Sequence, residues 1–348
     1  MPRYNYGGQA LIEGVLMRGR NAIAVAVRHP DGDVVWETER LDQSRIHRHR
    51  AATWPFVRGL VILYEQLVMG TRWLMRAAAI SASGEGVELG RGALAITLVV
   101  ALGFGVAIFF VLPLLLSQGA ATVSSGIGTL GQHLLEGVLR LAIFIAYLLL
   151  ISRSGEIKRV FQYHGAEHMS IHAMEHDDPL TPEAVRKYPT AHQRCGTEFL
   201  VVVIMLSILA FSLVGRQTPL VMVASRILLI PVIASVGYEL LRLGARHRSN
   251  PVVKVIMWPG ILVQKITTKQ PTDDMIEIAI VSLEEAIKAD GDPIPEGGLD
   301  LAREPMPKPG ETAAGVRALQ EQADAGISAA AAEGEATVPA AIDPPIAG

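Results

Sequence analysis

Four long apolar runs are the feature that most constrains the fold of this chain. A helix needs roughly 20 consecutive apolar residues to cross the hydrocarbon core of a bilayer. The runs cover residues 92–116, 134–152, 199–215 and 219–241. Half of the 348 residues are hydrophobic and 19% are charged, with a mean hydropathy of +0.33, which is too apolar for an ordinary soluble domain. We therefore expect a mainly α-helical, polytopic membrane protein with about four spans.

The distribution of arginine and lysine predicts the orientation of these spans. Both residue types are absent from the loop 117–133, whereas arginine is frequent before residue 80, in the segment 153–198 and again after residue 242. Basic loops stay on the cytoplasmic side of a membrane. We therefore expect a multi-pass protein of the bacterial cytoplasmic membrane with both termini and the segment 153–198 in the cytoplasm.

The N-terminal region is expected to contain β-structure. Residues 1–54 include the stretch AIAVAVRHPDGDVVWETE, in which two runs of β-branched residues flank the turn signal HPDGD. We expect a small cytoplasmic β-hairpin region here, with GGQALIEGVLMRG as a candidate third strand. Residues 55–80 are interpreted as an amphipathic helix in the membrane interface, because Arg58, Glu65 and Arg72 interrupt a spanning pattern.

The membrane domain is expected at residues 92–241, with the segment 153–198 as its cytoplasmic loop. Residues 242–289 return to soluble character and include a helix that starts at Thr272–Asp274. From residue 290 to 348 the composition is typical of a disordered tail.

A ladder of histidines stands between the second and third apolar runs. The stretch FQYHGAEHMSIHAMEH has histidine at 164, 168, 172 and 176. Residues four apart share one face of a helix. His164, Glu167 and His168 form the pattern H-x-x-E-H, the inverted form of the zinc-peptidase motif. In that chemistry the two histidines bind zinc and the glutamate is the general base toward water. This pattern predicts a divalent metal site, with zinc as the expected ion and Glu167 as the catalytic residue.

Further candidate ligands lie near the ladder. They are Glu175, His192, Cys195, and Glu239 at the inner end of the fourth run. A structural zinc site would use all of His164, His168, His192 and Cys195, whereas a catalytic site keeps one position open for water. In the catalytic interpretation, Glu175 or Glu239 would complete the ligand set.

Several motifs together resemble those of the YqhQ-like family of bacterial membrane proteins. These motifs are GGQALIEGVLMRG, YHGAEH, RCGTEF, RILLIPVIASVGYELLR and ITTKQPTDDMIEIAI, within residues 6–289. The resemblance implies a metal-dependent enzyme whose polar signature falls on Glu13, His164, Glu167, His168, Glu175, His192, Cys195, Arg226 and Glu239. Met169 and Gln193 depart from the pattern, which has lysine and proline there. His172 and His176 lie outside it and are interpreted as surface residues.

Glu13, Arg226 and the pair Glu136 and Arg140 carry charge in apolar surroundings. Glu13 either orients a metal-bound histidine or faces water from a strand. Because a charge inside a membrane is costly, Arg226 either faces the helix bundle or extends to the outer interface. Glu136 and Arg140, four residues apart, are interpreted as a local ion pair.

Two functions remain from this reasoning. The first is a zinc-dependent hydrolase, peptidase-like, whose H-x-x-E-H site lies on the cytoplasmic face of the membrane. The alternative is a non-catalytic membrane scaffold or assembly factor with a structural metal site. The expected partners are membrane lipids and a membrane-associated protein or peptide substrate, and no nucleic acid.

The predicted topology can be measured with reporter fusions at residues 125 and 180. We expect the two fusions to report opposite sides of the membrane, since the loop 117–133 lacks basic residues and the segment 153–198 carries them. Fusions that report the same side would rule out the four-span arrangement.

Overall fold

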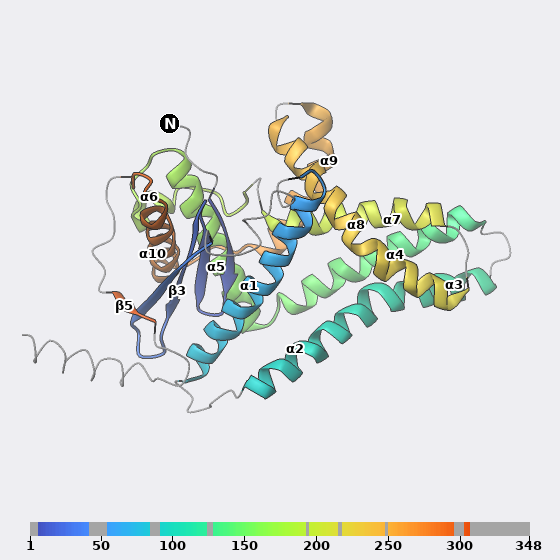
Figure 1. Cartoon of the computed structure of the whole chain (residues 1–348), viewed down its shortest axis with the longest axis horizontal. Helices are drawn as coiled ribbons and strands as arrows, with labels where there is room; N and C mark the ends of the chain where they lie inside the picture. The colour runs from blue at the N-terminus through green and yellow to red at the C-terminus, as the bar shows by residue number, and fades with distance from the viewer. Residues whose placement is uncertain are drawn as a thin grey trace, which may run out of the picture. The chain divides into compact units, whose positions relative to one another are not determined.

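The computed structural model of the chain describes residues 6–41, 54–83, 91–123, 128–192, 195–214, 218–247, 250–295 and 303–306. Over these residues the protein is mainly helical, with a small N-terminal β-sheet (Figure 1). The strands are β1 (Gly7–Leu11), β2 (Gly14–Arg18), β3 (Ala22–Arg28), β4 (Val34–Arg40) and β5 (Arg303–Pro305). The helices are α1 (Val57–Ser83), α2 (Arg91–Val106), the π-helical turn η2 (Ala107–Val111), α3 (Leu112–Val123), α4 (Thr129–Ile151), α5 (Gly155–Glu175), α6 (Pro182–Val185), α7 (Gly196–Val214), α8 (Pro219–Arg246), α9 (Pro251–Thr267) and α10 (Asp273–Asp290).

Strands β1 to β4 form an antiparallel meander, and β5 follows β4 in the order of the sheet. The predicted hairpin corresponds to β3 and β4, while GGQALIEGVLMRG supplies two strands, β1 and β2, instead of one. Gly32 in the HPDGD turn has φ +98°, a conformation that favours glycine. Most of the expected tail, 290–348, lies outside the described residues, and β5 is a short strand within it.

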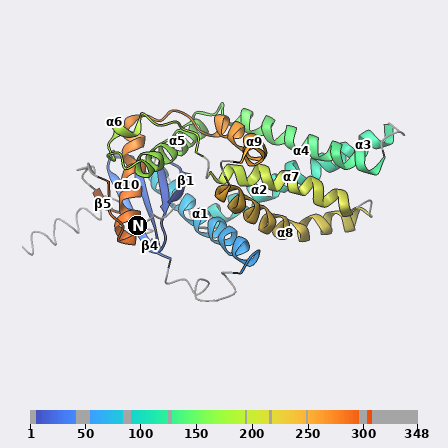
Figure 2. The same cartoon turned by 90° about the horizontal axis from the view of Figure 1, so that it is seen from above.

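One face of the sheet packs against helices α5 and α10 (Figure 2). Successive side chains of a strand point to opposite faces, so Val15 and Met17 of β2 lie on the same face as Ala24 and Ala26 of β3. All four are buried in one core with α5 and α10. Ser282 of α10 also donates a 3.0 Å hydrogen bond to the carbonyl oxygen of Ala24. This core therefore joins three distant parts of the sequence.

The second half of α1 contacts strands β1, β2 and β3 of the sheet. Trp73 and Ala77 are buried there, and Arg76 pairs with Glu37 of β4 at 2.8 Å. The first half of α1 carries exposed apolar side chains. The helix predicted at 55–80 is thus present, and its position in a membrane interface stays a prediction.

Two stretches of helix among the described residues are long and apolar enough to cross a membrane. They are Ala95–Ala120, which runs through α2, η2 and α3, and Gly131–Ile151 of α4. Helix α7 contains a shorter apolar stretch, Glu198–Phe211, and α8 does not meet the same criterion over its described residues. Length and composition thus support two of the four predicted spans.

A buried ion pair connects these apolar helices. Arg140 of α4 donates to Glu136, one turn earlier, at 2.7 Å, which confirms the predicted local pair. The same guanidinium donates to Ser207 of α7 at 3.1 Å and to the carbonyl oxygen of Phe109 in η2 at 3.0 Å. Arg140 therefore connects α4 to two further helical segments.

We expect Arg140→Met to lower the stability of the helical domain. Removing one partner of a buried ion pair costs about 3–5 kcal/mol, because the remaining charge keeps its desolvation cost. The measurement is the melting temperature in detergent, followed by circular dichroism. Arg153→Met, at an exposed position, is the control. Equal melting temperatures for the two variants would contradict this role of Arg140.

Candidate metal centre

The histidine ladder lies on helix α5, and most of the helix from Tyr163 to Met174 is buried. Because an α-helix has 3.6 residues per turn, the rungs of the ladder share one face. The segment before α7 and the end of α9 supply backbone groups to this face, and the link between α9 and α10 crosses it. At Gly165 the link approaches so closely that a Cβ would lie 2.1 Å from the carbonyl oxygen of Lys269. Glycine is therefore required where the link crosses the helix.

Backbone carbonyl groups orient the first three histidines. Nδ1 of His164 donates to the carbonyl oxygen of Thr267 at 2.9 Å, and Nδ1 of His168 donates to that of Thr190 at 2.6 Å. Nε2 of His172 donates to the carbonyl oxygen of Ala191 at 3.0 Å. A carbonyl oxygen can only accept, so each bond fixes the tautomer and makes the other ring nitrogen the acceptor.

The fourth histidine is oriented differently. His176 is the C-cap of α5; its Nδ1 donates to the carbonyl oxygen of His172 at 2.8 Å, and the side chain is exposed. His176 belongs to neither of the groups of potential metal ligands found among the described residues. Its interpretation as a local surface residue agrees with this position.

His164, His168 and Cys195 form the first group that could hold a metal ion. Their donor atoms lie within 4.8 Å of one another, and Nε2 of His164 is 3.2 Å from Sγ of Cys195. The two imidazole rings are 4.4 Å apart. The structure thus brings together three of the predicted ligands, from α5 and from the start of α7.

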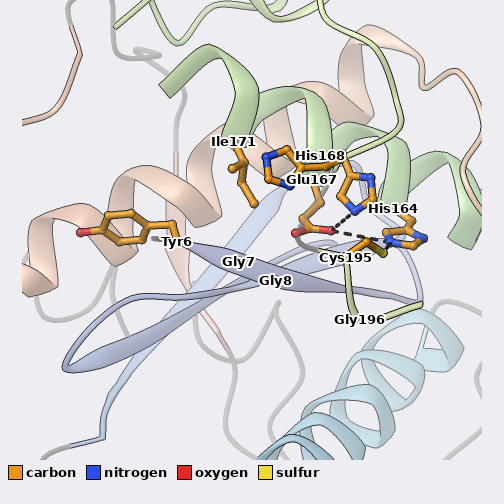
Figure 3. A pocket seen from close by; sticks show the side chains of 10 residues that line it. Tyr6, Gly7, Gly8, His164, Glu167, His168, Ile171, Cys195 and Gly196 are labelled. Atoms are coloured by element: carbon orange, nitrogen blue, oxygen red, sulfur yellow. Dashed lines mark hydrogen bonds and ion pairs between the residues drawn. The ribbon is translucent and has the colours of Figure 1, made fainter. Parts of the chain in front are cut away.

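A small cavity opens beside this group (Figure 3). Its volume is about 30 Å³, which is enough for a single water molecule. The residues that line it come from the start of β1, from α5 and from the segment before α7: Tyr6, Gly7, Gly8, His164, Glu167, His168, Ile171, His192, Cys195 and Gly196. The N-terminal sheet therefore forms one wall of the candidate site.

Glu167 lines the cavity beside His164 and His168 and is buried (Figure 3). Its Oε2 atom is 3.6 Å from Nε2 of His168 and 4.0 Å from Nε2 of His164. Burial raises the pKa of this carboxyl to about 8, and a hydrogen bond from the backbone of Gly8 partly opposes the rise. A Cβ on Gly8 would lie 3.0 Å from Cγ of Glu167, so glycine allows the strand to approach the carboxylate.

Burial also lowers the pKa of the two histidines. For His164 the effect of burial outweighs the bond to Thr267, and for His168 the neighbouring His164 adds to it. A neutral imidazole is the form that binds a metal ion. Both rings are therefore in the protonation state that metal binding requires.

A second group that could hold a metal ion consists of His172, Glu175 and His192. Nε2 of His192 is 3.4 Å from Oε2 of Glu175, and the rings of His172 and His192 are 4.4 Å apart. The sequence predicts Glu175 and His192 as ligands but treats His172 as a surface residue. The regular four-residue spacing of the ladder was the signal that could have included it.

Two other predicted residues, Glu239 and Glu13, are held by contacts away from these groups. The carboxylate of Glu239 accepts from Nε of Arg58 at 2.7 Å and from the backbone N–H of Phe56 at 3.2 Å, so the structure does not bring it to the candidate metal centre. Arg226 lies in α8, and its side chain is outside the described part of the chain.

Glu13 lies in the turn between β1 and β2 with φ +53°. Its carboxylate accepts from Nε of Arg159 at 2.6 Å and from the hydroxyl of Tyr163 at 3.3 Å, both on α5. Glu13 therefore anchors α5 to the sheet just before His164, through contacts with an arginine and a tyrosine. The side-chain pattern predicted neither Gly8 nor the carbonyl groups as parts of the site, because a backbone group leaves no signal in residue type.

Comparisons with known proteins find a matching family and a bacterial relative. The sequence profile of a family described as "Protein of unknown function (DUF1385)" matches residues 54–289. The "Uncharacterized protein YqhQ" of Bacillus subtilis (strain 168) is 30% identical over 300 residues, which are 81% of this chain and 92% of the relative. No solved structure matches the chain.

We expect the double variant His164→Ala, His168→Ala to lose about one divalent ion per chain, because one remaining donor cannot hold the ion against a chelator. The measurement is the metal content of the purified protein after dialysis against a chelator, by plasma mass spectrometry. His176→Ala, at the C-cap of α5, is the control and should keep the wild-type content. Full metal content in the double variant would exclude the first group as a metal site.

Proposed function

The chain belongs to the DUF1385 family, whose function is unknown, and we propose that this protein is a metal-dependent hydrolase of the bacterial cytoplasmic membrane. The observation that carries the proposal is the gathering of His164, His168 and Cys195 around a cavity that also holds the carboxylate of Glu167. Catalytic zinc sites use three protein ligands and keep a fourth position for water. The first group has this number of donors.

The donor types favour zinc. A thiolate with two imidazoles suits a borderline-soft ion and disfavours magnesium or calcium, which prefer oxygen ligands. His164 and His168 each offer Nε2, because their Nδ1 atoms are engaged by backbone carbonyl groups. Zinc bound by these residues would lower the pKa of a bound water molecule and polarise a carbonyl or phosphoryl group.

Glu167 is the proposed general base. Its carboxylate lies within 4.0 Å of both Nε2 atoms and borders a cavity of water size. The carboxylate can take a proton from the attacking water and deliver it to the leaving group. The backbone of Gly8 holds it in place, and the surrounding side chains keep bulk solvent away. These contacts orient the base, and zinc bound beside it would favour the ionised form of the carboxyl, which burial alone disfavours.

The four-span arrangement gains support from the core of the protein. The strands, α5 and α10 share one hydrophobic core, so they lie on the same side of any membrane that the chain crosses. The number of crossings between them is therefore even. Two apolar stretches, Ala95–Ala120 and Gly131–Ile151, precede α5. Spans at α7 and α8 would make the second pair, with both ends of the chain in the cytoplasm.

The proposed substrate is a membrane-associated peptide or protein. Helix α5 begins at Gly155, only four residues after the apolar stretch of α4 ends at Ile151. The site is therefore close along the chain to the membrane surface. The H-x-x-E-H pattern favours a peptide bond as the target, since peptidases use this arrangement of ligands and base.

A non-catalytic scaffold is the alternative, and the position of His192 favours it. His192 lines the same cavity as the first group, and its ring is 5.7 Å from that of His168. If His192 joined His164, His168 and Cys195, four ligands would close the site as in structural zinc sites. Such a site would hold the segment before α7 against α5 and would need no base.

We expect Glu167→Gln to distinguish the two functions. The amide keeps the shape of the carboxylate but cannot accept the proton, so turnover should fall by about 100-fold or more while metal content and melting temperature stay unchanged. The measurement is cleavage of a fluorogenic peptide library by the detergent-solubilised full chain. Growth of a deletion strain that expresses the variant gives a second readout.

The control for this substitution is Glu156→Gln, an exposed glutamate in the first turn of α5. It should retain wild-type turnover. If Glu167→Gln restored growth as well as the wild type, and Cys195→Ser lost both zinc and folded protein, the hydrolase would be rejected in favour of the scaffold.

A further inference from the structure

His172, Glu175 and His192 form a second group of donors next to the first, and we propose that this group holds a second divalent ion. Their donor atoms lie within 4.8 Å of one another. Two imidazoles and one carboxylate are a ligand set that zinc accepts in catalytic sites. The proposal of a second ion does not depend on the proposed hydrolase activity, because metal binding and turnover are measured separately.

The imidazole of His172 is held by contacts that commit one of its nitrogens. Nε2 donates to the carbonyl oxygen of Ala191 at 3.0 Å, which makes Nδ1 the nitrogen that would bind an ion. The ring stacks on Tyr188 with an interplanar angle of 9° and a centroid distance of 5.8 Å. The hydroxyl of Tyr188 in turn donates to Asp178 at 2.7 Å. Metal-bound histidines are held by outer contacts of this kind.

The backbone of His192 is held on both sides by the buried amide of Gln264. The N–H of His192 donates to Oε1 of Gln264 at 2.9 Å, and Nε2 of Gln264 donates to the carbonyl oxygen of His192 at 2.9 Å. These two bonds position the residue through its main chain. The imidazole therefore remains the part of His192 that meets Glu175.

The second group reaches the cavity beside the first group through His192. His192 of the second group lines it together with His164, His168 and Cys195 of the first. A second ion next to this cavity would suit a reaction in which the attacking and the leaving atoms both need charge stabilisation, as in hydrolysis of peptide or phosphate bonds. This last step rests on the proposed hydrolase, whereas the second ion does not.

The donor sets give the two positions different properties. The first includes a thiolate and is largely buried, whereas the second has no sulfur, and its Glu175 side chain is 28% exposed. We therefore expect the second ion to leave first when a chelator is added. Cobalt distinguishes the positions, because only a thiolate ligand produces a sulfur-to-cobalt charge-transfer band.

The test is a titration of the metal-stripped full chain in detergent with cobalt(II), followed by absorption spectroscopy. We expect two equivalents to bind. The first should raise both the charge-transfer band and the ligand-field bands, and the second should raise the ligand-field bands alone. Binding of a single equivalent by the wild type would overturn the proposal.

The variants His172→Ala and Glu175→Gln should each bind one equivalent and retain the full charge-transfer band. Glu175→Gln keeps the size of the side chain, so it remains informative if His172→Ala does not fold. His176→Ala, at the C-cap of the same helix, should bind two equivalents like the wild type. Two equivalents in both His172→Ala and Glu175→Gln would also overturn the proposal.

These results are independent of catalysis. A chain that binds two ions but cleaves no substrate would retain the second site and reject the hydrolase. A chain that binds one ion and loses turnover in Glu167→Gln would do the opposite.

Discussion

The bonds between three backbone carbonyl groups and three imidazoles are the interaction on which the rest of the candidate site depends. A buried imidazole and a buried carbonyl oxygen each need a hydrogen-bond partner. Thr267, Thr190 and Ala191 satisfy this need for His164, His168 and His172. The same bonds decide which nitrogen of each ring can bind an ion. The packing of the two covering segments on α5 therefore also orients the three imidazoles for metal binding.

Helix α5 is the element that these contacts share. The sheet reaches it through Gly8 and Glu13, the segment before α7 reaches it through Cys195 and His192, and the link between α9 and α10 crosses it at Gly165. A rigid helix holds several ligands in a fixed spacing. The covering segments then determine which of those ligands face one another. His192 comes from a covering segment, so its contacts in the folded chain, and not its place in the sequence, decide which donor group it joins.

Much of this arrangement could be predicted from residue types and spacing. The H-x-x-E-H pattern identified the first two donors, the HPDGD turn marked the hairpin, and Thr272–Asp274 marked the start of α10, which the structure begins at Asp273 after Thr272. Glu239 shows the limit of such reasoning. It carries a ligand-type side chain, but the packing of α1 on α8 brings Arg58 to it first.

His172 shows the opposite case. Its membership in a donor group depends on Ala191 and His192, which lie about 20 residues later and approach only in the folded chain. Gly8 is still farther from α5 in the sequence, and β1 brings it into contact with Glu167 only in the folded chain. Residue types carry no information about such contacts when the groups involved are main-chain atoms. The number of membrane spans is also hard to predict from the sequence, because hydropathy alone does not separate α7 and α8 from apolar helices that pack within a protein.

The shared core also sets an order in which the chain can fold during synthesis. Strands β2 and β3 leave the ribosome first, but α10 begins only at Asp273, about 245 residues after the end of β3 at Arg28. At typical elongation rates this delay is about 10–50 s. Helix α1 is made early and can protect one face of the sheet, whereas the face with Val15 and Met17 has to wait for α5 and α10. The apolar helices are therefore made while the sheet is still incomplete, and its open face would be prone to aggregation until α10 arrives.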